Sequence, residues 1–556
     1  MTKVLNQSKD YQPADEAYGF PLIIKQLLNR AKIVSRDQTI SYGNHLTYTY
    51  AAFFKRINRL ANVLKNAGLK AGDVVAVMDW DTHRYLEAYF AVPMSGMVLQ
   101  TVNIRFAKDQ VLYTLNHAKP KALLLNAEFA AMIKNHRYDA PSIEHVIWLD
   151  DSSENMPIPD YALGEYETLL SAASDKFDFP DFDENTIATT FYTSGTTGKP
   201  KGVFFTHRQI VLQVLTNLAS AALNTEGQGV RYTDVYMPMT PMFHVHAWCV
   251  PYWATLIGLK QIYPGRYLAN KLVDLIQQHQ ITLSHGVPTV LQMLVNEMNQ
   301  RNEKFNGLKI SIGGSKLNES LAHQAYACGI EFMCGFGMSE SAPTLSRSIF
   351  DGRQNNMTLE EQLRYRCLSG SPILLVDMAL WDEAGNPQPF DGVSTGELVV
   401  RAPWLTQSYF KDHDAGNQLW RGGWMHTQDI ASITPDGTLQ IVDRAKDVIK
   451  SGGEWISSLE VETILSFHPS VAEIAVIGVP DERWGERPLA LVVLKPNQND
   501  VKAEDILAIG LQAVEKGHLS KYALPNEIRF LAEMPKTSVG KLDKKTMRTM
   551  YAKNLL

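Results

Sequence analysis

Residues 191–202 read Phe-Tyr-Thr-Ser-Gly-Thr-Thr-Gly-Lys-Pro-Lys-Gly, a loop rich in hydroxyls and glycines between two apolar runs, 186–191 and 203–205. The apolar runs predict two strands joined by a flexible turn. Glycines let backbone N–H groups converge, while hydroxyls and lysines add donors and positive charge. The pattern therefore predicts a site for nucleotide phosphates. Its candidate ligands are Thr193, Ser194, Gly195, Thr196, Thr197, Gly198 and Lys199.

The Walker phosphate loop is the obvious comparison, and the spacing excludes it. That motif needs four residues between its glycines and a Ser or Thr directly after Gly-Lys. Here Gly195 and Gly198 stand three positions apart, and Pro200 follows Lys199. A solvated hairpin tip is the plain alternative, but tips seldom concentrate so many hydroxyls, glycines and lysines.

The bulk composition bounds the class of protein. A chain of 556 residues exceeds the usual size of one core, so a large domain and at least one smaller domain are expected. The formal net charge of -6 gives no sign of a surface for polyanions, and nucleic acid is not expected as a partner.

Four scattered cysteines form no disulfide framework or zinc motif, and residues 1–15 have no apolar core like that of a signal peptide. No run of about 18 apolar residues appears, so no integral membrane segment is expected. These features predict a cytoplasmic protein and leave attachment to a membrane surface open.

Helical and strand patterns alternate over most of the chain. Residues 50–68 have the apolar spacing of a helix and 73–78 that of a buried strand, and the pair recurs at 109–118 and 122–125. This alternation predicts an α/β fold of layered subdomains. Short β-like runs after Gly370 predict a β-rich subdomain, and a self-contained α+β pattern follows Asp443. We therefore expect a large N-terminal domain, 1–443, and a small mobile C-terminal domain, 444–556.

The loop at 191–202 resembles the signature of the acyl-adenylate-forming superfamily, which includes acyl-CoA synthetases, adenylation domains of peptide synthetases and beetle luciferases. Six further stretches resemble the superfamily's motifs in the same order, so that the resemblance spans about 190 to 541. They lie at 242–246, 312–317, 335–340, 426–430, 444–453 and 535–541.

For the nucleotide, the resemblance implies that Gly314 and Ser315 lie between the adenine and the acyl pocket. Gly335, Phe336, Gly337 and Met338 would border the adenine, with Phe336 stacked on it, and Ser339 would meet the α-phosphate. Glu340, together with Thr193, would hold Mg²⁺, for which a carboxylate beside phosphates is a preferred ligand. Asp429 and Arg444 would bind the ribose. Gln428 replaces the family's glycine before Asp429.

For the chemistry, the resemblance makes Lys541 the lysine that meets both the α-phosphate and the substrate carboxylate. Lys446 would be the hinge of the mobile domain. Lys450, Gly452 and Gly453 would line the tunnel for the pantetheine arm of CoA. Out of this context, the segment 444–453 would pass for a plain linker, and Lys541 for a solvated charge.

The acid pocket is assigned by the same resemblance to His244, a gate beside the carboxylate, and to Phe243, Trp248 and Trp404. A core position is the plain alternative for Trp248. If 242–246 is a strand, His244 and His246 share a face, so a metal pair is conceivable, although no third ligand is evident. No acidic residue occurs in 242–251, where relatives that activate amino acids carry an Asp. A plain carboxylic acid is therefore favoured.

Together these features predict an AMP-forming acyl-CoA synthetase that uses ATP and Mg²⁺, with CoA as a substrate. The stretches 424–429 and 451–457 resemble the branch of medium- and long-chain fatty acid ligases that also contains methylthiopropionate ligases. A medium- or long-chain fatty acid is the first expectation, and a short-chain acid or methylthiopropionate is the second. The alternatives are an adenylating enzyme that loads a carrier protein, a luciferase-like oxygenase and a silent nucleotide-binding module. A homodimer is left open.

Overall fold

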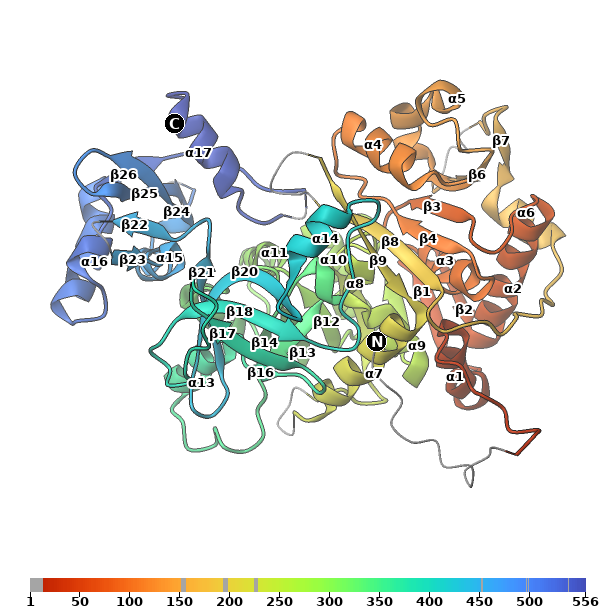
Figure 1. Cartoon of the computed structure of the whole chain (residues 1–556), viewed down its shortest axis with the longest axis horizontal. Coiled ribbons are helices and arrows are strands. Elements are labelled where there is room, and N and C mark those ends of the chain that lie inside the picture. The colour runs from red at the N-terminus through yellow and green to blue at the C-terminus, as the bar shows by residue number, and fades with distance from the viewer. Residues whose placement is uncertain are drawn as a thin grey trace.

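The structure is a computed structural model that describes residues 14–151, 157–193, 199–224, 229–451, 454–496, 498, 500–538 and 540–556. Within these ranges the chain forms four β-sheets. The first, in the N-terminal part of the chain, and the fourth, at the C-terminus, lie at opposite ends of the molecule (Figure 1). The α/β fold class with a large N-terminal and a smaller C-terminal domain is confirmed.

The first sheet has seven strands in the order β7-β6-β5-β3-β4-β8-β9, all parallel except for the antiparallel pair β8 and β9. The strands are β3 (Val74–Met78), β4 (Val98–Thr101), β5 (Ala122–Asn126), β6 (His145–Leu149), β7 (Ala162–Glu165), β8 (Ile187–Thr193) and β9 (Lys201–Thr206). The apolar strand β3 is buried apart from its first residue, as its sequence predicts. The hairpin β8–β9 brackets the predicted phosphate loop.

The second sheet has nine strands in the order β16-β15-β14-β13-β12-β10-β11-β1-β2, and its centre from β14 to β1 is parallel. They are β1 (Thr39–Tyr42), β2 (Leu46–Thr49), β10 (Val235–Met239), β11 (Lys260–Tyr263), β12 (Leu283–Gly286), β13 (Leu308–Ile312), β14 (Ile330–Gly337), β15 (Thr344–Arg347) and β16 (Ser371–Pro372). Ligands in α/β sheets bind beyond the carboxyl ends of such strands. Gly313 and Gly314 follow β13 at this edge, and β14 ends at Gly337.

The third and fourth sheets meet at the expected domain boundary. The third contains β17 (Asp377–Trp381), β18 (Gly396–Arg401), β19 (Trp420–Arg421), β20 (Trp424–Ile433) and β21 (Leu439–Arg444). The fourth contains β22 (Ile449–Ser451), β23 (Glu454–Ile456), β24 (Val471–Asp481), β25 (Gly485–Leu494) and β26 (Glu527–Phe530). The two apolar clusters of the fourth sheet draw only on residues beyond 448. The division into 1–443 and 444–556 remains our proposal.

Helices connect and cover the strands, and the periodic stretches form them where expected. Helix α2 (Tyr50–Asn66) begins at the Thr49 cap, whose side chain accepts from the Ala52 N–H, and it is followed by Gly68 at φ +86°. The other helices of the larger domain are α1 (Asn29–Val34), α3 (His83–Met94), α4 (Lys108–Ala118), α5 (His136–Asp139), α6 (Tyr166–Ala172), α7 (His207–Ala222), α8 (Val245–Trp248), α9 (Val250–Ile257), α10 (Ala269–His279), α11 (Pro288–Arg301), α12 (Glu319–Ala327), α13 (Leu359–Arg366) and α14 (His413–Leu419). The smaller domain adds α15 (Ser458–Leu465), α16 (Ala503–Glu515) and α17 (Lys544–Ala552). Four short 3₁₀ turns are η1 (Ile24–Leu28), η2 (Ala127–Ile133), η3 (Ser339–Ser341) and η4 (Lys521–Ala523).

Candidate active site

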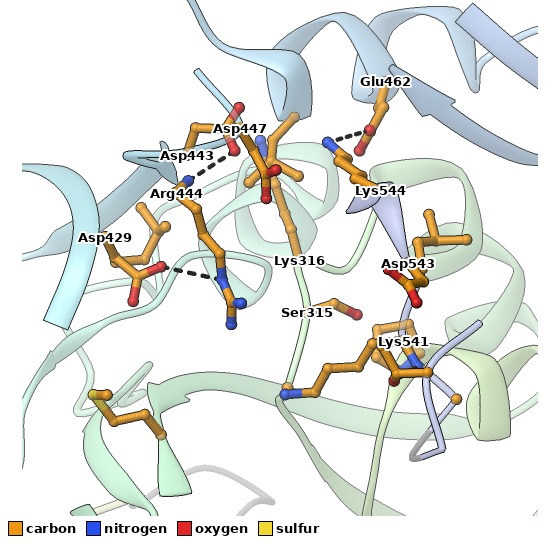
Figure 2. Close-up of a pocket in the computed structure, with 18 of the residues that line it drawn as sticks. Ser315, Lys316, Asp429, Asp443, Arg444, Asp447, Glu462, Lys541, Asp543 and Lys544 are labelled. Carbon is orange, nitrogen blue, oxygen red and sulfur yellow. Dashed lines mark hydrogen bonds and ion pairs between the residues drawn. The ribbon is translucent and has the colours of Figure 1, made fainter. Parts of the chain in front are cut away.

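A cleft of about 2890 Å³ lies where the three sheets of the larger domain meet the C-terminal domain. Segments far apart in the sequence supply its wall, and most of the residues singled out from the sequence are among them. These are Thr193, His244, Gly314, Ser315, Gly335, Phe336, Gly337, Met338, Ser339, Glu340, Asp429, Arg444, Lys446, Lys450 and Lys541. Figure 2 shows Lys541 reaching below Ser315 from one side and Arg444 from the other.

The phosphate loop is described only at its two ends. Thr193 at the end of β8 pairs with Lys201 at the start of β9, and both line the cleft. Lys199 is exposed, with its Nζ 5.4 Å from the centre of the Tyr113 ring. Ser194, Gly195, Thr196, Thr197 and Gly198 lie outside the described residues. Lys201, which the sequence reading counted only as loop charge, is an additional cation at this edge of the cleft.

Glu340 is buried in the short turn η3 and is held there by two contacts. Its Oε1 accepts a hydrogen bond from the Tyr409 hydroxyl at 2.7 Å, and its carbonyl oxygen accepts from the Thr406 N–H at 2.9 Å. Burial, followed by the adjacent carboxylate, raises the pKa of Tyr409, so this hydroxyl stays a donor at neutral pH. Lys201 Nζ lies 4.8 Å from the centre of the Tyr409 ring.

The magnesium site expected at Glu340 and Thr193 fits the residues present. Among the described residues, no group of three or more His, Cys, Asp or Glu side chains could hold a metal ion. Mg²⁺ in nucleotide sites commonly takes only one or two carboxylates and completes its shell with phosphates and water. A single oriented carboxylate facing a cleft, with a hydroxyl at the end of the phosphate-loop strand, matches that requirement.

The glycines after β13 bring the backbone close to two side chains. A Cβ on Gly313 would lie 3.1 Å from the Trp248 ring, and one on Gly314 would lie 3.1 Å from Lys541 Cε. Gly314 also has φ +85°, where a side chain is strained. This bend therefore forms a narrow passage with the indole on one side and the lysine on the other.

The second glycine pair, Gly335 and Gly337, lets β14 pack tightly against β15. A Cβ on Gly335 would lie 2.7 Å from the Ser346 carbonyl oxygen, and one on Gly337 would overlap the Pro343 carbonyl. Between them, Phe336 remains half-buried and lines the cleft. The absence of side chains on either side leaves its ring accessible to a planar ligand.

The ammonium of Lys541, a partly buried side chain, has a lowered pKa. Burial, followed by the nearby Arg444, lowers the pKa of its ammonium to about 8, and Asp429 and Glu340 oppose this shift. Among the described residues, no carboxylate lies within ion-pair distance of its Nζ. A protonated lysine placed in this way gains from any anion that enters the cleft.

Asp429 and Arg444 face each other on paired strands. Asp429 on β20 is the register partner of Arg444 on β21, and Arg444 Nε lies 3.6 Å from Asp429 Oδ1. Burial raises the pKa of Asp429 to about 6, although Arg444 and Lys541 pull it down. The carboxylate is therefore ionised at neutral pH and able to accept hydroxyl hydrogen bonds.

The replacement of the family's glycine by Gln428 has a visible consequence. Gln428 adopts φ +61°, a conformation that favours glycine. Two backbone contacts hold it: its N–H donates to Glu397 Oε1 at 3.1 Å, and its carbonyl accepts from the Ala445 N–H at 3.0 Å. The turn therefore survives the substitution and still presents Asp429.

One contact between the two expected domains is the hydrogen bond that Asn103 Nδ2 donates to Ser538 Oγ at 3.0 Å. Beside the expected hinge, Arg548 pairs with Asp447 at 2.6 Å within the smaller domain. Lys446 is exposed, and Lys450 lies 3.6 Å from Glu383 Oε1. Gly452 and Gly453 lie outside the described residues, so the tunnel loop is located only by Lys450.

The run at 242–249 is not a strand, so the shared face imagined for His244 and His246 does not exist. Val245, His246, Ala247, Trp248 and Cys249 all have φ between +47° and +58°, a continuous left-handed turn. His246 is buried in the core with Nε2 2.6 Å from Thr189 Oγ1, away from both cavities.

His244 and Trp248 line a second cavity of about 90 Å³ that opens at Gly314 and Lys541. Burial, with a smaller effect of Lys541, lowers the pKa of His244 to about 3, so the imidazole is neutral. The wall is largely apolar and aromatic, and it includes Val245, Trp253, Val287, Ile312, Phe336 and Met338.

The structure places two expected pocket residues elsewhere. Phe243 is buried with Arg105 over its ring at 5.9 Å, and Trp404 is fully buried in the core. Neither lines either cavity. Residues that sequence reasoning did not select, Trp253, His285 and Arg347, stand in the wall instead. In the sequence, only the cation of Arg347 inside the otherwise uncharged strand Thr344–Arg347 gave a signal.

Family comparisons agree with this geometry. Residues 29–410 match the family described as AMP-binding enzyme, and residues 460–541 match the AMP-binding enzyme C-terminal domain. The chain therefore belongs to the AMP-binding enzymes, among the AMP-forming acyl-CoA ligases. No helix among the described residues combines the length and the apolar character needed to cross a membrane.

Similar proteins are full-length matches. The long-chain-fatty-acid–CoA ligase of Thermus thermophilus is 36% identical over 531 residues, covering 94% of this chain and 93% of that protein. The 3-methylmercaptopropionyl-CoA ligase of Ruegeria lacuscaerulensis is 34% identical over 539 residues, covering 96% and 97%. The anthranilate CoA ligase AuaEII, solved with anthranoyl-AMP, shares the fold with a TM-score of 0.84 at 22% identity, covering 96% of this chain and 99% of that one.

Proposed function

We propose that this enzyme couples a carboxylic acid to CoA in two steps within the cleft, through an acyl-AMP intermediate. The observation that carries the proposal is the position of Lys541. This lysine comes from the C-terminal domain, yet it lines one cleft with Glu340, Asp429 and the phosphate-loop residue Thr193.

In the first step, a carboxylate oxygen of the acid attacks the α-phosphorus of ATP, a P–O bond forms, and pyrophosphate leaves. Two anions must approach each other, and the Lys541 ammonium offsets their repulsion. Asp429 and Arg444 hold the ribose, Phe336 contacts the adenine, and Ser339 with the donors of the loop at 193–199 binds the phosphates. Glu340 and Thr193 would hold Mg²⁺, which would neutralise phosphate charge.

In the second step, the CoA thiolate attacks the acyl carbonyl carbon, a thioester bond forms, and AMP leaves. The C-terminal domain turns about Lys446, which withdraws Lys541 and brings Lys450, Gly452 and Gly453 to the pantetheine arm. On the side of Lys541, this motion breaks the hydrogen bonds that Ser538 accepts from Asn103 at 3.0 Å and from Arg105 at 3.5 Å.

The acid occupies the cavity beside Trp248, with His244 at its entrance. An apolar cavity of about 150 Å³ accommodates a molecule the size of benzene, and this one measures about 90 Å³. Of the two expectations from the sequence, the volume supports the short acid over a medium- or long-chain fatty acid. A long chain would require the aromatic wall to open.

The test is a panel of acids scored by the release of AMP and pyrophosphate, with and without CoA. Release of AMP that depends on an acid, together with acyl-CoA when CoA is present, supports the proposal. Formation of ADP contradicts it. Acyl-AMP that never passes to free CoA indicates an enzyme that loads a carrier protein. Luminescence or oxygen uptake indicates an oxygenase.

We also propose a cytoplasmic location. For the oligomeric state, a monomer and a homodimer both remain open. All four cysteines are free thiols, which agrees with a reducing compartment. Light scattering of the purified protein measures the assembly, and fractionation of cells measures the location.

A further inference from the structure

Arg347 is a partly buried cation, and none of the carboxylates that the structure describes lies within ion-pair distance of it. It ends β15 opposite Gly335 on β14, and its guanidinium reaches Ser311 on β13, the strand beyond, with Nη2 3.5 Å from Ser311 Oγ. Its Nε is enclosed and has no hydrogen-bond partner among the described residues. The missing side chain of Gly335 leaves room for this path, since a Cβ there would lie 3.6 Å from Arg347 Cβ.

Lys309, a second cation in the same wall, does have a carboxylate partner. Lys309 Nζ lies 2.8 Å from Asp234 and also donates to the Gly229 carbonyl at 2.9 Å. Both Lys309 and Arg347 line the acid cavity, and of these two only Lys309 is paired with a carboxylate among the described residues. Burial lowers the pKa of Arg347 to about 10, so its charge persists at neutral pH.

Two more unsatisfied polar atoms belong to residues of the same cavity. His285 Nε2 on β12 lies 2.8 Å from the Tyr236 hydroxyl. His285 Nδ1 and Trp253 Nε1 have no hydrogen-bond partner within the described ranges. Buried polar groups without partners are rare in native proteins. Such atoms also occur elsewhere among the described residues, but these three belong to residues that line one cavity, where a ligand can supply the missing partners.

We propose that the acid activated by this enzyme carries a second carboxylate, remote from the reacting one, and that Arg347 binds it. This inference rests on the proposed function. A guanidinium matches a carboxylate with two parallel hydrogen bonds and an opposite charge. The methyl end of a fatty acid would leave the buried charge uncompensated, which is costly.

Two cations without a carboxylate within ion-pair distance among the described residues, Lys541 and Arg347, line this cavity. Lys541 lies beside the bend at Gly314, and Arg347 lies beside Ser311. Much of the remaining wall is aromatic and aliphatic, with the Trp248 ring 5.2 Å from the His285 ring. A short dicarboxylic acid with an apolar spacer is complementary to this arrangement of charge, and the small volume limits the spacer.

The first experiment compares acids of equal length on the wild-type enzyme. Butanoate is paired with succinate and hexanoate with adipate, and kcat/KM is measured by pyrophosphate release. Hydrogen bonds to charged groups contribute enough for the dicarboxylate of the preferred length to exceed its partner by about 10- to 100-fold. Equal values, or preference for the monocarboxylates at both lengths, would overturn the proposal.

The second experiment moves the preference by substitution. Arg347→Met keeps the length of the side chain and removes the charge, so the dicarboxylate should lose about 100-fold in kcat/KM while the monocarboxylate is unchanged or improved. Arg347→Lys keeps the charge but loses the fork and should fall between them. Arg353→Met is the matched control, because Arg353 is exposed and paired with Asp351, and it should change neither acid.

The outcomes separate this proposal from the proposed function. If no acid releases AMP, the proposed function fails. If AMP and acyl-CoA form but Arg347→Met leaves the ratio between the paired acids unchanged, only the role of Arg347 fails. If Arg347→Met does not fold, the wild-type ratio and Arg347→Lys still decide.

Discussion

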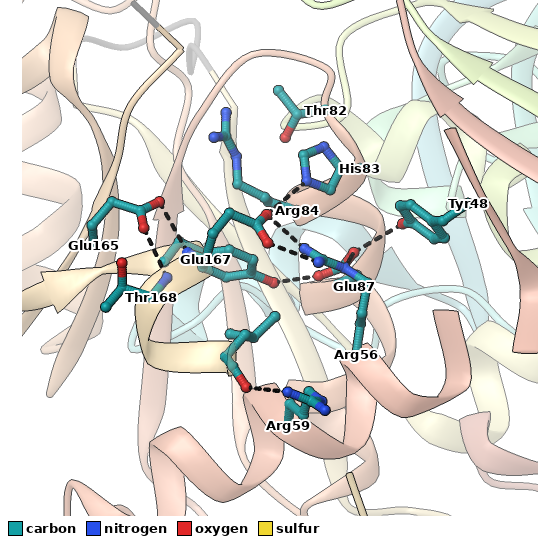
Figure 3. Close-up of polar contacts among 12 residues, drawn as sticks. Tyr48, Arg56, Arg59, Thr82, His83, Arg84, Glu87, Glu165, Glu167 and Thr168 are labelled. Atoms are coloured by element: carbon teal, nitrogen blue, oxygen red, sulfur yellow. Dashed lines mark hydrogen bonds and ion pairs between the residues drawn. The ribbon is translucent and has the colours of Figure 1, made fainter. Parts of the chain in front are cut away.

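Arg56 and Arg347 are both partly buried arginines, and the described residues surround them in opposite ways. Arg56 on α2 donates from Nε to Glu87 on α3 at 2.6 Å and from both terminal nitrogens to Glu167 on α6 at 2.7 Å (Figure 3). Its partners raise the pKa of Arg56, whereas burial alone lowers that of Arg347. The ion pairs of Arg56 give it a structural role, whereas the guanidinium of Arg347 can still form an ion pair with a ligand.

The partners of Arg56 are themselves saturated. Glu87 is fully buried and accepts from the Tyr48 hydroxyl at 2.8 Å and the Tyr166 hydroxyl at 2.6 Å. Glu167 also contacts His83 Nε2 at 3.2 Å, and hydrogen bonds from His83 and Arg56 outweigh its burial and lower its pKa. The cluster thus joins three helices and a strand, and the pairing of its charged groups with one another indicates a structural role.

The largest expected effect comes from breaking the paired cluster. Arg56→Met leaves the fully buried Glu87 without its cation, which should destabilise the protein by about 3–5 kcal/mol. Arg347→Met makes the same chemical change where no carboxylate is left behind, and it should be neutral or stabilising. Urea unfolding of both variants beside the wild type measures the contrast. Equal losses of stability would show that Arg347 has a structural partner.

Removing the other unpaired cation should cost activity rather than stability. Lys541→Ala is expected to lower acyl-AMP formation by about 10²–10³-fold, the usual cost of one preorganised group that stabilises charge. Thioester formation from supplied acyl-AMP should be spared, because the lysine is withdrawn in that step. Pyrophosphate release and thioester formation are assayed separately, with Lys521→Ala, an exposed lysine of the same domain, as a control. Equal loss in both steps would contradict the two orientations of the C-terminal domain.

The pH profile sharpens the comparison within the cleft. The charge of Lys541 is lost as pH rises through about 8, and that of Asp429 is lost as pH falls through about 6. The Lys541 ammonium attracts the phosphates of ATP, and the Asp429 carboxylate accepts hydrogen bonds from its ribose hydroxyls. The pH profile of kcat/KM for ATP should therefore be bell-shaped, with its limbs near these two values. Lys541→Arg should shift the alkaline limb beyond the measured range, because arginine keeps its proton. A flat profile from pH 5 to 9 would exclude these two groups.

The smallest effects distinguish single hydroxyls in the two regions. Tyr166→Phe removes a short hydrogen bond to buried Glu87 and should cost about 1–3 kcal/mol of stability. Ser311→Ala removes only the 3.5 Å contact with Arg347 and should change stability by less than about 0.5 kcal/mol. Thermal unfolding of both variants measures this difference. A larger loss for Ser311→Ala would place Arg347 among the structural charges.

Motifs with fixed local chemistry were readable from the sequence. The α/β alternation, the strands around the phosphate loop, and the segments that carry Glu340, Asp429 and Lys541 follow from periodicity and from a family resemblance spanning about 350 residues. That these segments converge on one cleft is a property of the fold, since Lys541 lies far along the chain from the strands that it faces.

The acid pocket could not be read in the same way. Phe243 and Trp248 belong to one apolar run, and the left-handed turn from Val245 decides which of them meets the cavity. Periodicity assumes a strand or a right-handed helix, so it assigns such a segment wrongly. Arg347 was visible as a residue, but its lack of a partner depends on contacts among three strands that no local pattern encodes.

The turn at 245–249 has a consequence for how this enzyme could change its substrate. Left-handed residues cost roughly 1–2 kcal/mol each, and five in succession approach the whole net stability of a typical domain. Contacts with neighbouring residues must therefore offset this cost. Glycine at any of the five positions would relieve the backbone strain, but it would also remove a side chain that packs in or behind the wall of the pocket. Selection for thermal stability alone would therefore favour substitutions in this turn that widen the range of accepted acids. Substitutions on the strand that carries Arg347 are the more direct way to a new specificity.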